Sequence, residues 1–275
     1  MWIFLWLSLS LTTPVAGADW QIDGAPQQGA VLFGRTAPGA VVTLDGQSVQ
    51  VSAAGRFVLG FGRDAPTTAV VEATLPSGER LRQELKVAQR KYDIQRIDGL
   101  PPAQVTPPPE VLERIADDNA QVRRARARRD QRDDFSGGFI WPAEGRISGV
   151  YGSQRVLNGQ PRRPHYGIDV AAPTGTPVVA PAPGVVTLAH PDMYYSGGTM
   201  IIDHGHGLSS TFLHLSQMHV AVGDVVAQGD LVGDIGATGR VTGPHLDWRM
   251  NWHGARVDPE LLVPCRRESQ GDCPN

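Results

Sequence analysis

Short apolar runs, each ended by glycine, proline or a polar turn, follow one another along most of this chain and constrain its fold more than any other feature. Runs such as Ala40–Leu44 and Arg56–Gly60 are too short for helices and have the length of β-strands. The 32 glycines and 22 prolines among 275 residues place turns between such runs. With 41% hydrophobic residues the chain can form a core, so we predict a mainly β protein rather than a helical bundle or a disordered polymer.

The amino-terminal eighteen residues are expected to lie outside the fold. Residues 2–11 are apolar except for serines, and Ala16-Gly17-Ala18 forms a small-x-small cleavage pattern. This predicts a signal peptide over residues 1–18 and a periplasmic or secreted protein with no membrane span once mature. An uncleaved anchor is the alternative, because no Lys or Arg precedes the apolar run.

Residues 19–90 predict a small β-sandwich similar to bacterial immunoglobulin-like modules, because strand-length runs recur about every ten residues between turn signals. No catalytic cluster occurs here, so we expect a spacer or a docking module for a partner envelope protein. The expected strands are Ala30–Gly34, Ala40–Leu44, Arg56–Gly60, Thr68–Ala73 and Leu81–Val87.

Residues 91–135 predict a proline-rich and arginine-rich linker. The prolines from 101 to 109 favour a stiff, extended stretch, and Glu110 to Asp134 is expected to be helical. The arginine run at 123–132 suggests either an anion-binding arm or, as we favour, a solvated helix with ion pairs four residues apart. The net charge of −3 gives no reason to expect nucleic acid as a partner.

Residues 136–263 predict one compact antiparallel β domain. The expected strands are Val178–Ala180, Gly184–Ala189, Thr199–Asp203, Ser209–Leu215, Asp224–Val226, Asp230–Ile235 and His245–Met250. In the tail at 264–275, Cys265 and Cys273 are expected to close a small loop as a disulfide, which fits an oxidising compartment. A two-cysteine metal site is the alternative, although it lacks neighbouring His or Cys ligands.

Histidines and carboxylates gather in this last domain. His165 and Asp169 are four residues apart, so on a strand both side chains would share a face, and Gly167 between them would leave room for an ion or a water molecule. His245 and Asp247 are two apart and would also share a face. Imidazole and carboxylate groups are the ligands that zinc and similar divalent ions take from proteins.

The order and setting of these residues, with His214 between them, resemble the lysostaphin/LytM-type zinc metallo-endopeptidases, which are peptidoglycan hydrolases. The resemblance covers roughly Phe139 to Val263 and implies a duplicated hybrid motif fold, a compact antiparallel β domain with an open groove. It also implies hydrolysis of peptide bonds in peptidoglycan stems or cross-links. It rests on His165-Tyr166-Gly167-Ile168-Asp169, Ala180–Val186, Ile202–Gly207, Phe212–Leu215, Val222–Asp224, Gly236–Gly239 and Thr242–Trp248.

Carried over by position, the resemblance implies one zinc ion per chain, held by His165, Asp169 and the second residue of an HxH motif, which here is Asp247. His245 is then the implied general base, and His214 the catalytic histidine that stabilises the oxyanion. Aspartate at the third position departs from the family pattern. It makes the donor set more anionic and the bound water less acidic, and it could shift the preference toward other divalent ions.

Further residues around the site are candidates for substrate binding. Arg155, Asn158 and Tyr194 could line the groove; the alternatives are local hydrogen bonds for the first two and simple packing for the tyrosine. His204 and His206 lie in a glycine-rich turn, and the resemblance gives them no ligand role, so we expect them to be structural.

Two functions follow from this sequence. The first is an exported zinc endopeptidase that remodels the cell wall. The second is a non-catalytic scaffold that binds peptidoglycan or activates a partner cell-wall hydrolase. Four of the five site positions match the family and the fifth keeps a possible ligand, which favours the enzyme. A sugar-binding β module is a third class, but the tryptophans at 141, 248 and 252 do not decide it.

Overall fold

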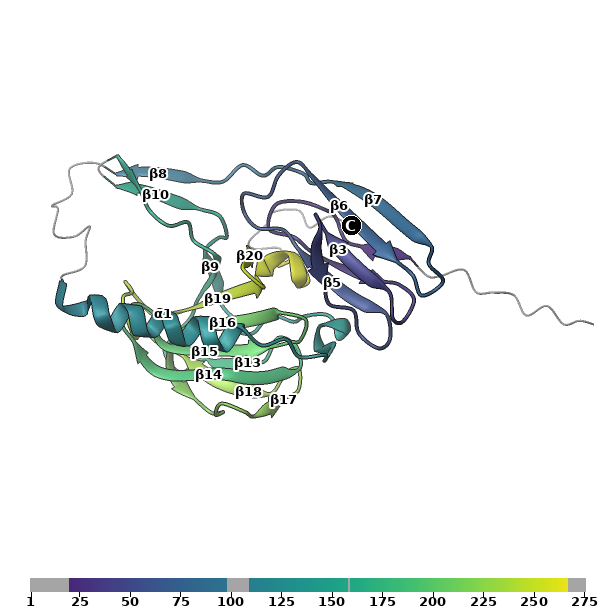
Figure 1. Ribbon diagram of the computed structural model, residues 1–275. Coiled ribbons are helices and arrows are strands. Elements are labelled where there is room, and N and C mark those ends of the chain that lie inside the picture. Colours follow the sequence, from purple (N-terminus) through teal and green to yellow (C-terminus); the bar gives the residue numbers. More distant parts are fainter. Residues whose placement is uncertain (1–19, 98–108, 158, 267–275) are drawn as a thin grey trace, which may run out of the picture.

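The computed structural model describes residues 20–97, 109–157 and 159–266, and these residues form two β modules joined by a segment that holds one long helix (Figure 1). The prediction of a mainly β, antiparallel fold is confirmed. The predicted signal peptide at 1–18, the prolines from 101 to 108, Asn158 and Cys273 lie outside the described residues. Within the described ranges, no helix has the length and hydrophobicity that crossing a bilayer requires.

The amino-terminal module consists of two antiparallel sheets packed around a shared core. Residues alternate between the core and solvent along the strands, as in Thr68–Thr74, and Phe57 and Val71 are fully buried. This is a β-sandwich, and its immunoglobulin-like topology stays a prediction. One sheet has the order β1 (Gln21–Asp23), β2 (Val31–Arg35), β5 (Arg56–Gly60), and the other β4 (Gln47–Val49), β3 (Val41–Leu44), β6 (Thr68–Thr74), β7 (Arg80–Lys86).

The linking segment packs against the second module instead of standing free. Helix α1 (Leu112–Arg126) follows a short 3₁₀ turn, η2 (Pro109–Val111), and places Val122 and Ala125 on Leu188 and Ile201 of the carboxy-terminal sheet. Arg114 pairs with Asp192 of that module, so this ion pair reaches the sheet and does not run along the helix.

The helix is shorter than the sequence suggested, ending at Arg126 rather than Asp134. Beyond it, the chain runs to Arg132, whose Nη2 lies 2.6 Å from Oδ2 of Asp203. A second 3₁₀ turn, η3 (Asp134–Gly137), then buries Phe135. The ion pair with Asp203 and the burial of Phe135 explain why the helix does not continue.

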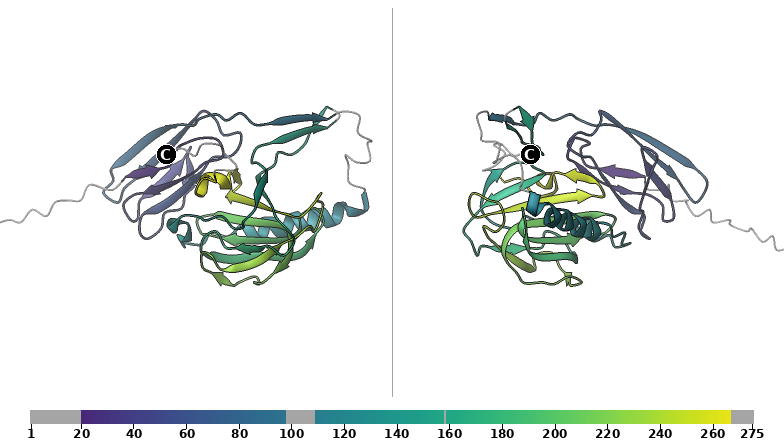
Figure 2. Two further views of the ribbon diagram at one scale, coloured as in Figure 1. Left: turned by 180° about the vertical axis from the view of Figure 1, so that it is seen from behind. Right: turned by 60° about the vertical axis from the view of Figure 1, so that its left-hand side comes forward.

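The carboxy-terminal module, whose strands are coloured teal to yellow in Figure 2, is built on one large antiparallel sheet. The central order of its strands is β17-β14-β15-β16-β19-β12-β9. Fully buried Phe212, Trp248 and Ile168 form part of its core. All seven expected strands occur, whereas β9 and β20 were not predicted. The elements are β9 (Arg146–Gly149), β12 (Gly167–Ala171), β13 (Pro177–Val179), β14 (Gly184–Met193), β15 (Gly197–Asp203), β16 (Leu208–Met218), β17 (Val225–Val226), β18 (Leu231–Ile235), β19 (His245–Trp252), β20 (Ala255–Val257) and η4 (Pro259–Leu262).

A small separate sheet joins the linker to the carboxy-terminal module. Strand β8 (Ile94–Ile97) pairs in parallel with β10 (Gln154–Leu157), which pairs antiparallel with β11 (Gln160–Pro161). Figure 1 shows β8 and β10 side by side, away from the large sheet. None of these three strands was predicted. Residues far apart in the sequence therefore share one small sheet.

The two modules also touch directly. Nη1 of Arg90 lies 2.6 Å from Oδ2 of Asp258, whose side chain is 1% exposed. A Cβ on Gly60 would come within 2.6 Å of Trp252, so a glycine is required there for the modules to approach. The amino-terminal module is thus packed onto its neighbour through a buried ion pair and a close backbone contact.

Candidate metal centre

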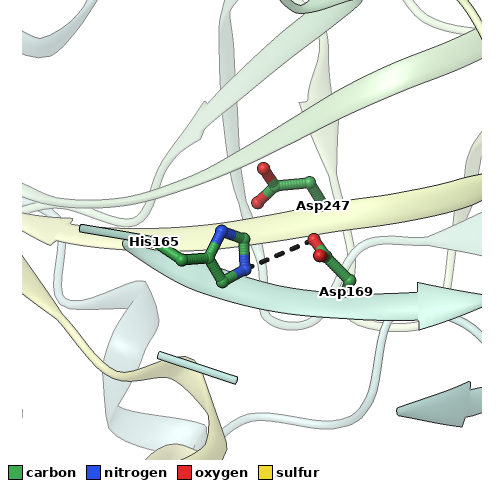
Figure 3. A group of neighbouring side chains, drawn as sticks. All are labelled: His165, Asp169 and Asp247. Atoms are coloured by element: carbon green, nitrogen blue, oxygen red, sulfur yellow. Dashed lines mark ion pairs between the residues drawn. The ribbon is translucent and has the colours of Figure 1, made fainter. Parts of the chain in front are cut away.

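Three side chains converge beside strands β12 and β19 of the large sheet, as the sequence predicted (Figure 3). Ligand atoms of His165, Asp169 and Asp247 all lie within 4.8 Å of one another. Asp169 on β12 is the register partner of Asp247 on β19, which explains why these two carboxylates share a face. Nε2 of His165 lies 3.3 Å from Oδ1 of Asp169.

His165 reaches the site by a different route from the one predicted. The spacing suggested that His165 and Asp169 lie on one strand, but β12 begins only at Gly167, so His165 belongs to the preceding loop. Its backbone N–H donates to the carbonyl of Ser153, and its carbonyl accepts from the N–H of Gly152, each at 2.8 Å. Two main-chain hydrogen bonds therefore position this side chain, and strand periodicity does not.

Two glycines leave room for the carboxylates. A Cβ on Gly167 would lie 2.5 Å from Oδ1 of Asp247, and a Cβ on Gly149 would overlap Oδ2 of Asp169. Neither position could take a larger residue unless the carboxylate moved. The space that the sequence predicted around Gly167 is present.

The donor set fits a divalent cation. Nε2 of His165 and Oδ1 of Asp169 are buried and face each other at 3.3 Å, but neither forms a hydrogen bond with a described residue, although buried polar atoms usually have a hydrogen-bond partner. Zinc binds nitrogen and oxygen ligands at about 2.0–2.2 Å, so one ion could contact all three groups after small movements. Burial disfavours the charged imidazole, but Asp169 and Asp247 outweigh it and raise the pKa of His165 above its ordinary value.

Arg249 belongs to this centre, and the sequence analysis missed it. Its Nε lies 2.9 Å from Oδ1 of Asp247 and its Nη2 lies 2.5 Å from Oδ2, a two-pronged ion pair with a carboxylate that is 3% exposed. Burial alone would raise the pKa of Asp247, yet the Arg249 guanidinium holds that pKa below its usual range. The available signal was position, because residues two apart on one strand share a face.

The Arg249 charge offsets the departure from the family pattern. A neutral histidine with two carboxylates carries one more negative charge than two histidines with one carboxylate. The guanidinium cancels that excess, so the net charge around the ion equals that of the His-Asp-His set.

A pair of histidines stands beside the three donors. The ring centroids of His214 and His245 are 4.9 Å apart. Nδ1 of His214 lies 2.9 Å from the carbonyl of Thr238, and Nδ1 of His245 lies 2.9 Å from the carbonyl of Gly243. A carbonyl only accepts, so each Nδ1 carries the hydrogen and each neutral ring keeps its lone pair on Nε2.

His214 also has an unusual backbone conformation. Its φ of +66° lies in the left-handed region, near a register shift in β16. Such conformations cost about 1–3 kcal/mol and gather at functional sites. Burial lowers the pKa of His214, which favours the neutral ring at neutral pH.

The remaining candidate residues divide into groove and packing positions. Arg155 lines a groove of about 740 Å³ that also contains His165 and Asp169. Tyr194 is not among the lining residues; its backbone N–H donates to Asp118, and its ring contacts Tyr195. Both remain predictions as substrate-binding residues.

His204 and His206 lie in the buried interior and not at the metal centre. His204 is fully buried, with Nδ1 2.7 Å from the carbonyl of Pro183 and Nε2 2.8 Å from Oγ of Ser210. His206 packs edge-on against Phe135. These contacts are structural, in keeping with the expectation for both residues.

Comparison with known proteins places this centre inside a matching family segment. Residues 163–259 match the model of peptidase family M23. Over 128 residues, which make up 46% of this chain, the sequence is 38% identical to the DD-carboxypeptidase/endopeptidase Mpg of Neisseria meningitidis serogroup B. Over 97 residues, or 34% of this chain, it is 42% identical to the peptidoglycan DD-endopeptidase ShyA of Vibrio cholerae. The aligned parts span 29% and 22% of those relatives, less than a third of either.

The similarity to one solved structure extends over both modules. A crystal structure of a putative peptidase M23 from Pseudomonas aeruginosa superposes with a TM-score of 0.68 at 29% identity. The match covers 86% of this chain and 95% of that chain, so it includes the amino-terminal module as well as the metal centre.

Proposed function

The chain carries a domain of peptidase family M23, and we propose that it is a zinc-dependent endopeptidase that hydrolyses peptide bonds in peptidoglycan stems or cross-links. The observation that carries this proposal is the convergence of three metal-ligand side chains and two histidines on one side of the sheet, inside the family segment. The names of the two relatives, an endopeptidase and a peptidoglycan endopeptidase, support this choice of substrate.

His165, Asp169 and Asp247 would hold the ion, which when bound supplies a Lewis acid and lowers the pKa of a coordinated water molecule. Arg249 keeps Asp247 ionised and restrains the rotation of its carboxylate. His245 has its free Nε2 3.8 Å from Oδ1 of Asp169, where it can take a proton as the general base. The imidazolium form of His214, with a proton taken from solvent on Nε2, can donate to a developing oxyanion.

This proposal places the mature protein in the cell envelope, in the periplasm or outside the cell. Cys265 is in a disulfide, which is typical of an oxidising compartment. The disulfide partner expected from the sequence, Cys273, lies outside the described residues. The amino-terminal module, in which the sequence shows no catalytic cluster, would then serve as a docking module.

The direct test combines metal analysis with digestion of purified peptidoglycan by the full-length chain. We expect one zinc ion per chain, new stem-peptide fragments by mass spectrometry, and loss of both after treatment with a chelator. A chain without bound metal would contradict the zinc site. A zinc-loaded chain that releases no fragment would instead identify the scaffold that binds peptidoglycan or activates a partner hydrolase.

Substitution of Asp247 tests the third ligand. Asp247→His should keep or raise zinc affinity, whereas Asp247→Ala should lower it more than about 100-fold, because loss of a ligand exceeds the effect of changing an outer-shell residue. Competition with a fluorescent zinc chelator measures both. Asp192→Ala is the matched control, since that carboxylate is 75% exposed and lies outside the centre. Full zinc affinity in Asp247→Ala would show that Asp247 is not a ligand.

A further inference from the structure

Arginines dominate the lining of the groove that includes His165 and Asp169 of the candidate metal centre. Apart from Arg249, four of them line it: Arg155, Arg162, Arg163 and Arg240. The lining includes two carboxylates, Asp93 and Asp169, and the second of these is a metal-ligand candidate. The groove volume of about 740 Å³ falls within the range of roughly 300–1,000 Å³ that is typical of ligand sites.

Among the described residues, none of these four guanidinium groups is paired with a carboxylate. Arg249 is committed to Asp247, but in the described part of the chain none of the four forms an ion pair. Nε of Arg162 is buried and without a hydrogen-bond acceptor there. Four positive side chains therefore face a groove in which Asp93 is the one lining carboxylate outside the metal centre.

The arginine side chains belong to well-anchored backbone. Arg155 lies on β10, the central strand of the small sheet β11-β10-β8, and its carbonyl accepts from the N–H of Arg162 at 2.8 Å. Arg163 precedes the ligand His165 by two residues. The N–H of Arg240 donates to the carbonyl of Tyr195 at 2.9 Å, and its guanidinium lies 5.9 Å from the centroid of that ring.

We propose that this groove selects acidic peptides, with Arg155, Arg162, Arg163 and Arg240 binding free carboxylates next to the bond that is cleaved. This inference rests on the proposed peptidase function and adds the charge of its substrate. A guanidinium binds a carboxylate through two parallel N–H groups, and such charge-assisted bonds are stronger than neutral ones. A groove in which positive side chains outnumber carboxylates also raises the local concentration of an acidic ligand.

A pair of peptides of equal length tests the selectivity. One is a fluorescein-labelled hexapeptide with two glutamates, and the other has glutamine at both positions. Fluorescence anisotropy gives their dissociation constants for the full-length, zinc-loaded chain carrying His245→Ala, a change made to prevent turnover. We expect the glutamate peptide to bind at least about 10-fold more tightly, in line with charge-assisted hydrogen bonds, and this preference to shrink in 0.5 M NaCl, because salt screens exposed charges.

The arginines are then removed in the same background. Arg155→Gln/Arg163→Gln removes two of the four arginines and should lower the ratio of the two dissociation constants below that of the unaltered groove. Arg35→Gln/Arg80→Gln removes the same charge from exposed positions of the amino-terminal module and should keep the ratio. Circular dichroism checks that the variants fold. If the double variant does not fold, the effect of salt on the preference of the unaltered groove for the glutamate peptide still tests the proposal.

Equal binding of the two peptides, or a ratio that survives removal of both arginines, would overturn the inference. Because binding is read without turnover, an absence of peptidoglycan cleavage would contradict the proposed function and leave this result standing. Cleavage combined with equal binding would contradict the selectivity alone.

Discussion

At the scale of single residues, the pairing of Asp247 with Arg249 sets the charge of the candidate metal centre. Both side chains lie on one face of β19 and in contact, and the carboxylate is nearly inaccessible to solvent. A buried carboxylate without its counter-charge is costly, so the metal-free protein should depend on Arg249 for stability.

We expect Arg249→Met to lower the free energy of unfolding of the metal-free chain by about 3 kcal/mol, because it leaves Asp247 buried and uncompensated. Urea denaturation in the presence of a chelator measures this. The double variant Asp247→Leu/Arg249→Met removes both charges and should recover most of the loss. Equal stability of Arg249→Met and the unaltered chain would mean that the ion pair has no structural role.

The glycines of the centre allow a second test. Gly167→Ala should abolish tight zinc binding, because its Cβ would displace the Asp247 carboxylate. Gly243→Ala is the matched control: Gly243 lies two residues from His245, as Gly167 lies two residues from His165, but its Cβ would meet no atom within 4 Å. Titration with a zinc chelator should separate the two variants by more than about 10-fold in affinity. Similar affinities would show that the space above Gly167 is not needed.

The sequence was sufficient to predict which metal-ligand side chains lie together, but not which backbone elements position them. His165, Asp169 and Asp247 could be named because residue type and motif order carry that information. The loop position of His165 could not, since it depends on hydrogen bonds to Gly152 and Ser153 across a non-local contact. The role of Arg249 was not predicted, because sharing a strand face with Asp247 does not by itself distinguish an arginine in a buried ion pair from an exposed one.

At the scale of elements, strands flanked by glycine and proline were predictable, and strands that depend on distant pairing were not. Strand β8 has the sequence Ile-Gln-Arg-Ile and is defined by its parallel pairing with β10, more than fifty residues along the chain. Helix α1 ends early because the residues after it contact Asp203. The local sequence pattern does not predict strand β8 or the end of helix α1, because tertiary contacts determine the conformation at both places.

The turn that joins β15 to β16 should make stability depend on pH. Burial lowers the pKa of His204 to about 4, below the value of about 6.5 in an unfolded chain. As the pH falls from about 6.5 to about 4, the unfolded state takes up a proton that the buried ring of the folded state does not bind. The free energy of unfolding therefore falls by up to roughly 3 kcal/mol. Urea midpoints at pH 7 and pH 4.5 should therefore differ less in His204→Gln than in the unaltered chain. An identical difference in both would refute this contribution.

At the scale of the whole molecule, one buried ion pair connects the two modules. Arg90 follows the amino-terminal sandwich, Asp258 closes the peptidase module, and Oδ1 of Asp258 also accepts from the N–H of Glu260. The sequence predicted the order of the modules, but not this contact, because no local pattern relates residues so far apart. The solved Pseudomonas aeruginosa structure covers most of both modules, so the combination is not peculiar to this chain.

We expect Arg90→Met to destabilise the chain by about 3–5 kcal/mol, because it leaves the Asp258 carboxylate buried and unpaired. Thermal unfolding and limited proteolysis between the modules measure the effect. Arg82→Met is the matched control, since its pair with Glu72 is 60% and 55% exposed and should contribute less than about 1 kcal/mol. Equal losses in both variants would show that the contact between the modules is no stronger than a surface pair.

The pairing of β8 with β10 determines where this chain can be cut and joined to a related one. The segment that matches the peptidase family begins at residue 163. Strand β8 at residues 94–97 lies outside it, yet it pairs with β10, the strand that carries Arg155. A gene fragment encoding the family segment alone would transfer the candidate metal ligands without β8 and β10. Exchanges of this module between related chains should therefore be cut before residue 90, so that the strand that carries Arg155 keeps its partner.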